Sequence, residues 1–324
     1  MGLNAVDLLI VAALALAVVT GIRAGFVTTL YGLLTWIVAI PVALVLQGPL
    51  GSLLARFGLA LPVAGTVAFV FVLLVIESGF AIGGAMAVVP FVKRMHADRL
   101  LGPADRALGI VPSILRTLVV TAVALSAAFV LPVGNDVRAT IDSSRIGQVL
   151  VEQVAAAQPG LAALSGGGSG ASPLLVTRLG ADQTQPLNLP DGLVLTPDPE
   201  AEAAMLALVN DERTSRGLVA LALDPRLVPI ARQHSEEMFR LKYFGHQSPV
   251  NGSPFDRLMA ARISYSRAGE NLAYAQSLAV AHRSLMDSPG HRENILRPEF
   301  TRIGIGVVSA GPYGRMFTQL FISP

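Results

Sequence analysis

The side chains best suited to chemistry lie in three short polar segments of the last third of the chain, "YFGHQSP", "AGENLA" and "SPGHRENIL". They supply two imidazoles, His246 and His291, one carboxylate, Glu270, and the amides of Asn271 and Asn294. Such groups can bind a divalent metal with an open coordination position, work as an acid/base set, or form a polar floor for a sugar or a lipid headgroup. None of the pairs has the i, i+4 spacing of a helical zinc motif, so scattered surface histidines are an alternative.

Two neighbouring residues have simpler interpretations. His234 shares a helical face with apolar residues, which favours a hydrogen-bonded core histidine. Ser288 precedes Pro289, and this order is typical of the N-cap of a short helix that carries His291. A serine nucleophile at this position would need a base and an orienting partner that the sequence does not reveal.

An ordinary α/β pattern must position these groups. Asp224 before Pro225 and Ser253 before Pro254 are helix-start signals, and Gly217 is a helix-end signal. Alternating, β-rich stretches near the C-terminus predict an antiparallel pair with Gly311 in the turn. The sequence predicts helices over residues 200–216, 224–241, 254–261 and 277–287, and strands over 302–309 and 314–323.

The composition is that of a membrane protein. Of 324 residues, 52% are hydrophobic and 14% are charged, against about 25% charged in ordinary globular chains. Cysteine is absent, which excludes disulfides, thiolate metal sites and cysteine nucleophiles. The formal net charge is +2 and no dense Lys/Arg run occurs, so no nucleic-acid partner is expected.

Four apolar stretches, residues 5–22, 27–46, 62–92 and 110–131, are each long enough for a spanning helix. A cleaved signal peptide is the alternative for the first, but a basic start is missing and another span follows at once. Buried core helices are the alternative for the set. Five basic residues in and beside the third loop place that loop in the cytoplasm and both termini outside, with Arg56 disagreeing.

Two charges fall inside the apolar stretches, Glu77 in the third and Arg116 in the fourth. The third stretch is too long for one span, and Gly83 and Gly84 offer a break that would put both charges at comparable depth. We therefore expect the two to pair. A proton or solute path is the functional interpretation, and a structural ion pair or a protonated packing residue is the alternative.

The segments "VDLLI", "GIRAGF" and "LGPADRALGIVPSILRTLVV" resemble the CvpA (colicin V production protein) family over roughly residues 3–158. The resemblance implies an all-α, four-helix inner-membrane domain, linked by its name to toxin production, with no catalytic residues to carry over. Residues 141–157 predict a trailing amphipathic helix. Ser165 to Pro173 has linker composition, and residues 174–199 are expected to be extended and to dock through Leu187, Leu189 and Leu193.

Six motifs in order, "ALVNDERTSRGL", "ARQHSEEM", "YFGHQSP", "GENLA", "SPGHRENIL" and "IGIGVV", resemble the CAP (SCP-like, pathogenesis-related-1) superfamily over residues 200–324. The resemblance implies an α+β three-layer αβα sandwich with a pocket in a central cleft, and His246, Glu270 and His291 match three pocket positions. Eukaryotic members have a second glutamate where this chain has Asp287 and Ser288, which weakens a four-ligand metal site.

These patterns predict a membrane domain over residues 1–158, a linker over 159–199 and a domain outside the bacterial cytoplasmic membrane over 200–324. The expected function is binding of an envelope glycan, lipid or peptide, linked to toxin production or secretion through the membrane half. A metal-assisted or acid/base hydrolase and a transport component are the alternatives. No cofactor is established by the sequence, and zinc or another divalent cation is the candidate.

Overall fold

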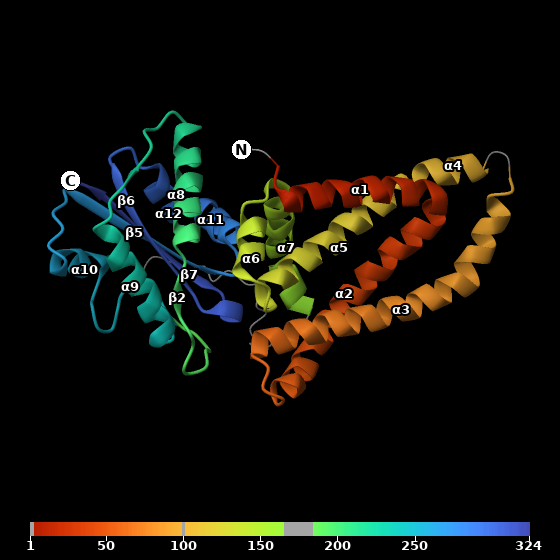
Figure 1. Cartoon of the computed structure of the whole chain (residues 1–324), viewed down its shortest axis with the longest axis horizontal. Coiled ribbons are helices and arrows are strands. Elements are labelled where there is room, and N and C mark those ends of the chain that lie inside the picture. Colours follow the sequence, from red (N-terminus) through yellow and green to blue (C-terminus); the bar gives the residue numbers. More distant parts are fainter. Residues whose placement is uncertain (1–2, 99–100, 165–183) are drawn as a thin grey trace. The chain divides into compact units, whose positions relative to one another are not determined.

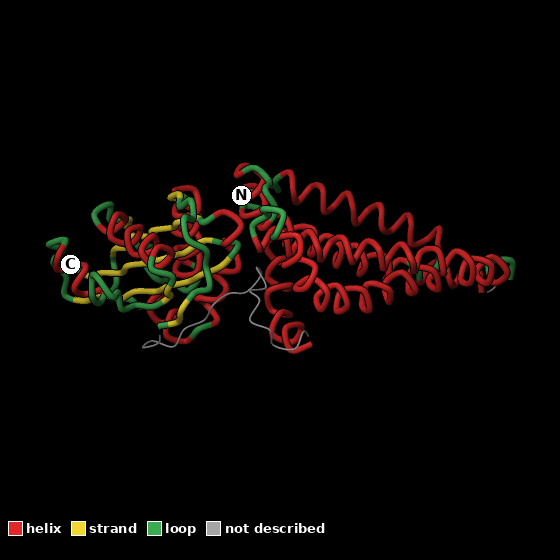
Figure 2. The backbone as a smooth tube through the Cα atoms, turned by 90° about the horizontal axis from the view of Figure 1, so that it is seen from below, coloured by secondary structure: helices red, strands yellow, loops and turns green. Residues whose placement is uncertain are grey.

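The computed structural model describes residues 3–98, 101–164 and 184–324, and the chain divides into two compact units, residues 1–172 and 173–324. Figure 1 labels the elements in chain order. Figure 2 shows that the long helices belong to the first unit and the described strands to the second.

Long apolar helices make up most of the first unit. Four segments are long and apolar enough to cross a membrane, which confirms the four predicted spans. Their outward-facing side chains are mostly leucine, valine, isoleucine and phenylalanine, as expected for contact with lipid. The helices are α1 (Ala5–Ala24), α2 (Phe26–Ala55), α3 (Leu61–Met95), the short α4 (Leu101–Leu108) and α5 (Ile110–Val130).

The short helix α6 (Asn135–Asp142) and the longer α7 (Arg145–Leu164) lie at the end of the bundle where α1 begins (Figure 1). The Asp7 carboxylate of α1 accepts hydrogen bonds from the Ser144 hydroxyl at 2.7 Å and the Ile146 amide at 2.8 Å. Asp7 thus satisfies amides at the start of α7, as an N-cap does. The predicted single helix over residues 141–157 is therefore wrong at its start, because the chain turns before Arg145.

The opposite end of the bundle is closed by α4 and the turn between α1 and α2. Gly25 has a φ of 81°, and a Cβ there would lie 1.7 Å from Asp105 Oδ2. Asp105 accepts a hydrogen bond from the Val27 amide at 3.0 Å and lies 2.6 Å from His96 Nε2. Only glycine fits this tight turn, which explains the "GIRAGF" segment.

Helix α3 is continuous, and the break expected at Gly83 and Gly84 does not occur. Gly84 instead lets the ring of Tyr31 approach, since a Cβ on Gly84 would lie 2.6 Å from the Tyr31 ring. The Tyr31 hydroxyl donates a hydrogen bond to the Phe80 carbonyl at 2.8 Å. Away from water the backbone hydrogen bonds of α3 have no competitor, so glycine serves close packing here rather than a break.

A five-stranded sheet organises the second unit, in the order β2-β6-β7-β5 with β3 paired to β6. A separate two-stranded sheet joins β1 to β4. The strands are β1 (Gln185–Pro186), β2 (Thr196–Pro197), β3 (Ala222–Leu223), β4 (Tyr243–Phe244), β5 (Arg267–Ala275), β6 (Arg302–Ser309) and β7 (Arg315–Ser323). The helices are α8 (Pro199–Thr214), α9 (Leu227–Arg240), α10 (Pro254–Ala260), α11 (Leu278–Asp287) and α12 (Pro289–Leu296), with a 3-10 turn over Gly311–Tyr313.

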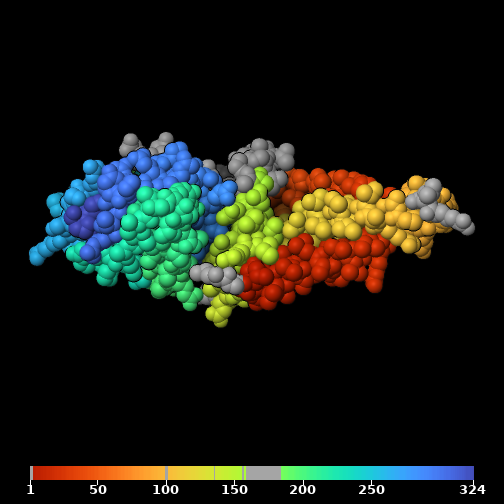
Figure 3. All heavy atoms as spheres, turned by 90° about the horizontal axis from the view of Figure 1, so that it is seen from above, coloured from red at the N-terminus to blue at the C-terminus, as the bar shows by residue number. Residues whose placement is uncertain are grey.

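Helices cover both faces of this sheet. On one face α9 packs against β6 and β7, and a Cβ on Gly306 of β6 would lie 2.1 Å from the Arg232 backbone of α9. Helices α11 and α12 pack on β5 and, with α8, form the other layer. Figure 3 shows α8, in green, against the blue later segments. The predicted αβα sandwich is confirmed.

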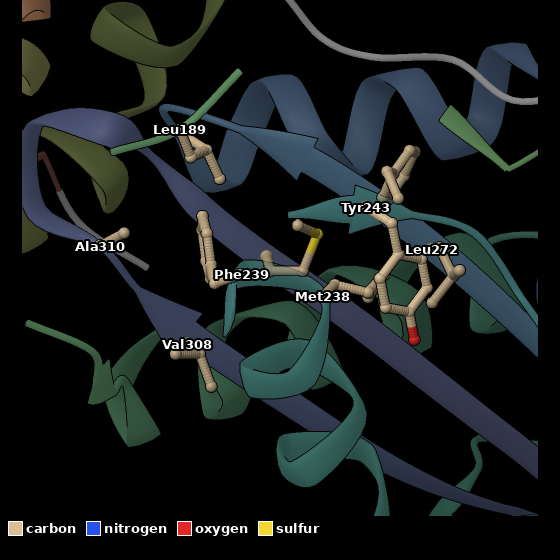
Figure 4. Close-up of a cluster of buried hydrophobic side chains, with 9 residues drawn as sticks. Leu189, Met238, Phe239, Tyr243, Leu272, Val308 and Ala310 are labelled. Carbon is tan, nitrogen blue, oxygen red and sulfur yellow. The ribbon is translucent and has the colours of Figure 1, made fainter. Parts of the chain in front are cut away.

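The core beneath α9 also takes in the chain that precedes α8 (Figure 4). Leu189 is buried with Phe239 and Val308, and Leu187 and Leu193 pack against the same cluster. The expected docking of this extended segment is confirmed. Residues 185–197 therefore complete the core of the second unit, although the sequence assigned them to the linker. The predicted flexible run of residues 165–173 lies outside the described residues.

Candidate functional site

The predicted site residues gather around β5, the strand at one edge of the sheet. Successive side chains of a strand point to opposite faces, so Glu270 faces α9 and α10 while Asn271 faces α12. An edge strand lets groups from both faces meet around it. This is how His246, which precedes α10, and His291, on α12, come to lie with ring centroids 6.4 Å apart.

The Glu270 carboxylate is held by two partners. Its Oε2 accepts a hydrogen bond from Arg257 Nη2 at 2.6 Å, and its Oε1 lies 2.9 Å from His246 Nδ1. Arg257 also donates from Nη1 to the backbone carbonyls of His246 and Gly252, at 3.1 and 2.8 Å. The Glu270 side chain is 1% exposed, so this ion pair is shielded from water.

Arg257 was missed at the sequence level. It lies in the first turns of α10, where Ser253 and Asp256 form a capping box that fixes the start of the helix. The Ser253-Pro254 signal predicted the helix correctly. Nothing local indicated that the fourth residue of that helix reaches a carboxylate on β5, because the two groups meet only through the tertiary fold.

The Glu270 carboxylate determines which nitrogen of His246 donates a hydrogen bond. Burial by itself raises the pKa of Glu270, but the hydrogen bond from His246 and the charges that face it, including Arg257, bring that pKa below its usual value. An ionised carboxylate accepts hydrogen bonds only, so His246 must donate from Nδ1. The second ring nitrogen of His246, Nε2, is not used by Glu270, and the ring remains 20% exposed.

His291 provides a second imidazole, and this one is neutral. Burial, and secondly the neighbouring His246, lowers the pKa of His291 to about 4. Asn271 donates to the His291 carbonyl at 3.0 Å, and Asn294 donates to the Asn271 amide oxygen at 2.9 Å. The two asparagines, predicted as pocket residues, therefore hold α12 on β5. Asn271 is fully buried and Asn294 is half-buried.

His234 is a core histidine, as expected. It is fully buried on α9, and its Nε2 lies 3.1 Å from the Gly245 carbonyl and 3.9 Å from Glu270 Oε1. Burial lowers the pKa of His234 to about 4. His234 is thus an uncharged, buried neighbour of Glu270.

Among the described residues, the set predicted to bind a metal, His246, Glu270 and His291, is not arranged as a three-ligand group. Within the described ranges, no group of three or more His, Cys, Asp and Glu side chains is arranged to hold a metal ion. Both oxygens of Glu270 are taken, by Arg257 and by His246. Two imidazoles remain, whereas catalytic zinc sites use three protein ligands.

In the first unit, the predicted pairing of Glu77 with Arg116 is wrong. Glu77 Oε2 accepts a hydrogen bond from the Thr35 hydroxyl at 3.1 Å. No ion pair joins Glu77 to Arg116 in the part of the chain that the structure describes. Both side chains instead line one cavity between α2, α3 and α5.

Comparison with known families agrees with the two units. Residues 6–155 match the family model described as colicin V production protein. Residues 206–321 match CAP, described as cysteine-rich secretory protein family. The chain therefore joins a CvpA-type membrane region to a CAP domain.

Two curated relatives come from Bacillus subtilis (strain 168). The uncharacterized protein YkwD is 44% identical over 122 residues, which are 37% of this chain and 46% of that protein. The uncharacterized membrane protein YlbC is 35% identical over 123 residues, which are 38% of this chain and 34% of that protein. The chain thus spans less than half the length of either relative.

Solved structures that are similar to part of this chain include that of an extracellular protein of Bacillus anthracis that contains an SCP domain. It is 34% identical with a TM-score of 0.36, over 39% of this chain and 41% of that chain. An outer surface protein of Borrelia burgdorferi is 18% identical with a TM-score of 0.38, over 40% of this chain and 98% of that chain.

Proposed function

We propose that this protein displays its CAP domain outside the cytoplasmic membrane and there binds an envelope ligand, a glycan, lipid or peptide, at His246 and His291. The observation that carries the proposal is the orientation of His246 by the buried Glu270–Arg257 ion pair. It leaves the Nε2 atom of His246 without a protein partner among the described residues. We call His246 and His291 the imidazole pair.

The chemistry of the imidazole pair suits hydrogen bonding to hydroxyl and amide groups. A neutral imidazole offers one hydrogen-bond donor and one acceptor. Glycan hydroxyls, lipid headgroups and peptide amides all complement such a pair. The family description of residues 6–155 adds the prediction that ligand capture serves toxin production or secretion.

The distribution of basic residues supports this orientation. Arg23, Lys93, Arg94 and Arg106 lie at the α4 end of the membrane unit, whereas the start of α1 and helices α6 and α7 lie at the other end. Cytoplasmic loops carry the excess of Lys and Arg. The α4 end is therefore cytoplasmic, and the chain leaves α7 on the outer side.

A hydrolase is the second candidate, and one observation favours it. His246 is paired through Nδ1 with an ionised carboxylate, the arrangement that orients a general base. A general base alone does not complete a hydrolytic site, which also needs a nucleophile or an activated water. Binding of an envelope ligand is therefore the proposed function, and hydrolysis of such a ligand is the alternative that the following experiment examines.

The experiment is a titration of the soluble CAP domain, residues 184–324, with three probes: muropeptides, phospholipid vesicles and a synthetic stem peptide. Heteronuclear NMR should show saturable shifts with one probe, centred on the His246 and His291 rings. His246→Ala and His291→Ala should remove them, while Arg240→Ala, an exposed residue of α9 with its own ion pair to Glu236, should not. The absence of shifts with every probe would contradict binding, and probe cleavage lost in His246→Ala would favour the hydrolase.

A further inference from the structure

A cavity of about 200 Å³ lies inside the membrane unit, between α2, α3 and α5. Most of its wall is glycine, alanine, valine and phenylalanine. Its polar wall includes Tyr31, Thr35, Glu77 and Arg116. Two opposite charges therefore face one cavity in a bundle whose segments are otherwise suited to lipid.

One oxygen of Glu77 has no partner among the residues that the structure describes. Its Oε2 accepts a hydrogen bond from the Thr35 hydroxyl at 3.1 Å, whereas its Oε1 is buried and without a hydrogen bond. A buried polar atom left unsatisfied costs free energy, and more so when it is charged. Ionisable residues at membrane depth are expensive and generally mark a functional site.

Arg116 is equally available. Its guanidinium lies against Gly32 of α2, where a Cβ would come within 3.0 Å of Nη1. Glycine at this position makes room for the guanidinium beside the cavity. Neither charge neutralises the other among the described residues, so each presents an uncompensated group to the same space.

We propose that this cavity binds a small zwitterion, with its ammonium at Glu77 and its phosphate or carboxylate at Arg116. An ammonium donates to the Glu77 carboxylate, and the planar guanidinium of Arg116 matches two oxygens of an anion. The Tyr31 hydroxyl, which donates to the Phe80 carbonyl, has its lone pairs left to accept from the ammonium. A ligand with only a negative charge would be repelled by Glu77, and a ligand with only a positive charge would be repelled by Arg116.

The ligand comes either from a lipid headgroup or from a free solute with the same two charges. Tyr31 and Thr35 lie about 8 and 14 Å along α2 from its start at Phe26, at 1.5 Å per residue. The cavity is therefore in the leaflet at the α4 end of the bundle, close enough to the interface for a phosphoethanolamine headgroup to enter.

Trp36, the chain's single tryptophan, reports on the site because it follows Thr35 on α2 and is buried against α3. The test titrates the full chain in dodecyl maltoside micelles and follows Trp36 fluorescence. The probes are lysophosphatidylethanolamine, lysophosphatidylglycerol, which lacks the ammonium, and free glycine. We expect a saturable change with lysophosphatidylethanolamine and a Kd for lysophosphatidylglycerol at least about tenfold weaker. Saturation by glycine alone would assign the site to a free zwitterion.

Variants connect the signal to the charges. Glu77→Gln and Arg116→Gln should each weaken binding about tenfold or more, and Gly32→Ala should weaken it by crowding Arg116. Ser78→Ala is the matched control, because this exposed neighbour of Glu77 only donates to the Leu74 carbonyl of its own helix. Circular dichroism checks that each variant folds. Equal affinity for the two lysolipids, unchanged affinity in all three variants, or no saturable signal with any probe would overturn the proposal.

Discussion

Glu270 shows how one buried carboxylate organises the candidate site. It pairs with Arg257 at 2.6 Å on one oxygen and with His246 at 2.9 Å on the other. Removing one partner of a buried ion pair leaves an uncompensated charge, whereas removing both is much better tolerated. The stability of the domain and the orientation of His246 therefore depend on the same contact.

Arg257→Met should destabilise the CAP domain by about 3 kcal/mol or more, because it leaves Glu270 buried without its cation. The double variant Arg257→Met/Glu270→Gln should recover part of that loss. Urea unfolding of the original protein, the two single variants Arg257→Met and Glu270→Gln, and the double variant measures the loss of stability and its recovery. Additive losses in the double variant would show that the two side chains are not coupled in stability.

Acidification should destabilise the domain over a defined range. The pKa values of His234 and His291 are lowered to about 4 from 6.5, so the unfolded chain takes up these protons first. The free energy of unfolding should fall as the pH drops from about 6.5 to 4, by up to ~3 kcal/mol from fully buried His234. Unfolding curves across that range give the slope, and His291→Gln should make it shallower. A slope unchanged by this substitution would contradict the pKa assigned to His291.

Divalent metal should have little effect on the CAP domain. A ligand that binds only the folded state raises the melting temperature, but no third protein ligand joins the imidazole pair among the described residues. Thermal melts with zinc or with chelator at pH 7.5 should therefore agree closely. A rise of several degrees with zinc that disappears in His246→Ala would show that a metal site forms after all.

At the scale of elements, local signals located the helices well. Ser253 and Ser277 cap α10 and α11 where the sequence placed their starts, and β6 has the predicted bounds. Strand β5 was missed although it carries Glu270. Its segment "RAGENLAYA" has no β-branched residue, and it is extended because it pairs with β7 along its whole length. Such long-range pairing leaves no mark in the local pattern.

The extended segment before α8 gives an element-scale prediction. A fragment that begins at Thr184 keeps β1, β2 and the buried Leu189, whereas one that begins at Pro199 loses all three. The longer fragment should be soluble, monomeric and cooperatively folded, and the shorter one should be less stable by about 2–5 kcal/mol, the range for large core deletions. Thermal and urea unfolding compare the two. Equal stability would show that residues 185–197 do not belong to the domain core.

At the scale of the whole molecule, the chain joins four segments suited to a bilayer with a CAP domain. Hydropathy predicted these segments because lipid imposes a length and an absence of charge that are legible in the sequence. The two charged residues inside these segments, Glu77 and Arg116, could also be identified in the sequence. Their arrangement relative to each other could not. Whether two charges pair or face a cavity depends on the rotation of each helix, which composition does not specify.

The most direct test of the proposed function is to determine on which side of the membrane one position of each unit lies. The chain has no cysteine, so Ala97→Cys, after α3, and Val250→Cys, an exposed residue of the CAP domain, each create a unique thiol. An impermeant maleimide applied to intact cells should label Val250→Cys, and should label Ala97→Cys only after the membrane is permeabilised. Labelling of Ala97→Cys in intact cells, with Val250→Cys protected until permeabilisation, would place the CAP domain in the cytoplasm and contradict its proposed role in binding envelope ligands.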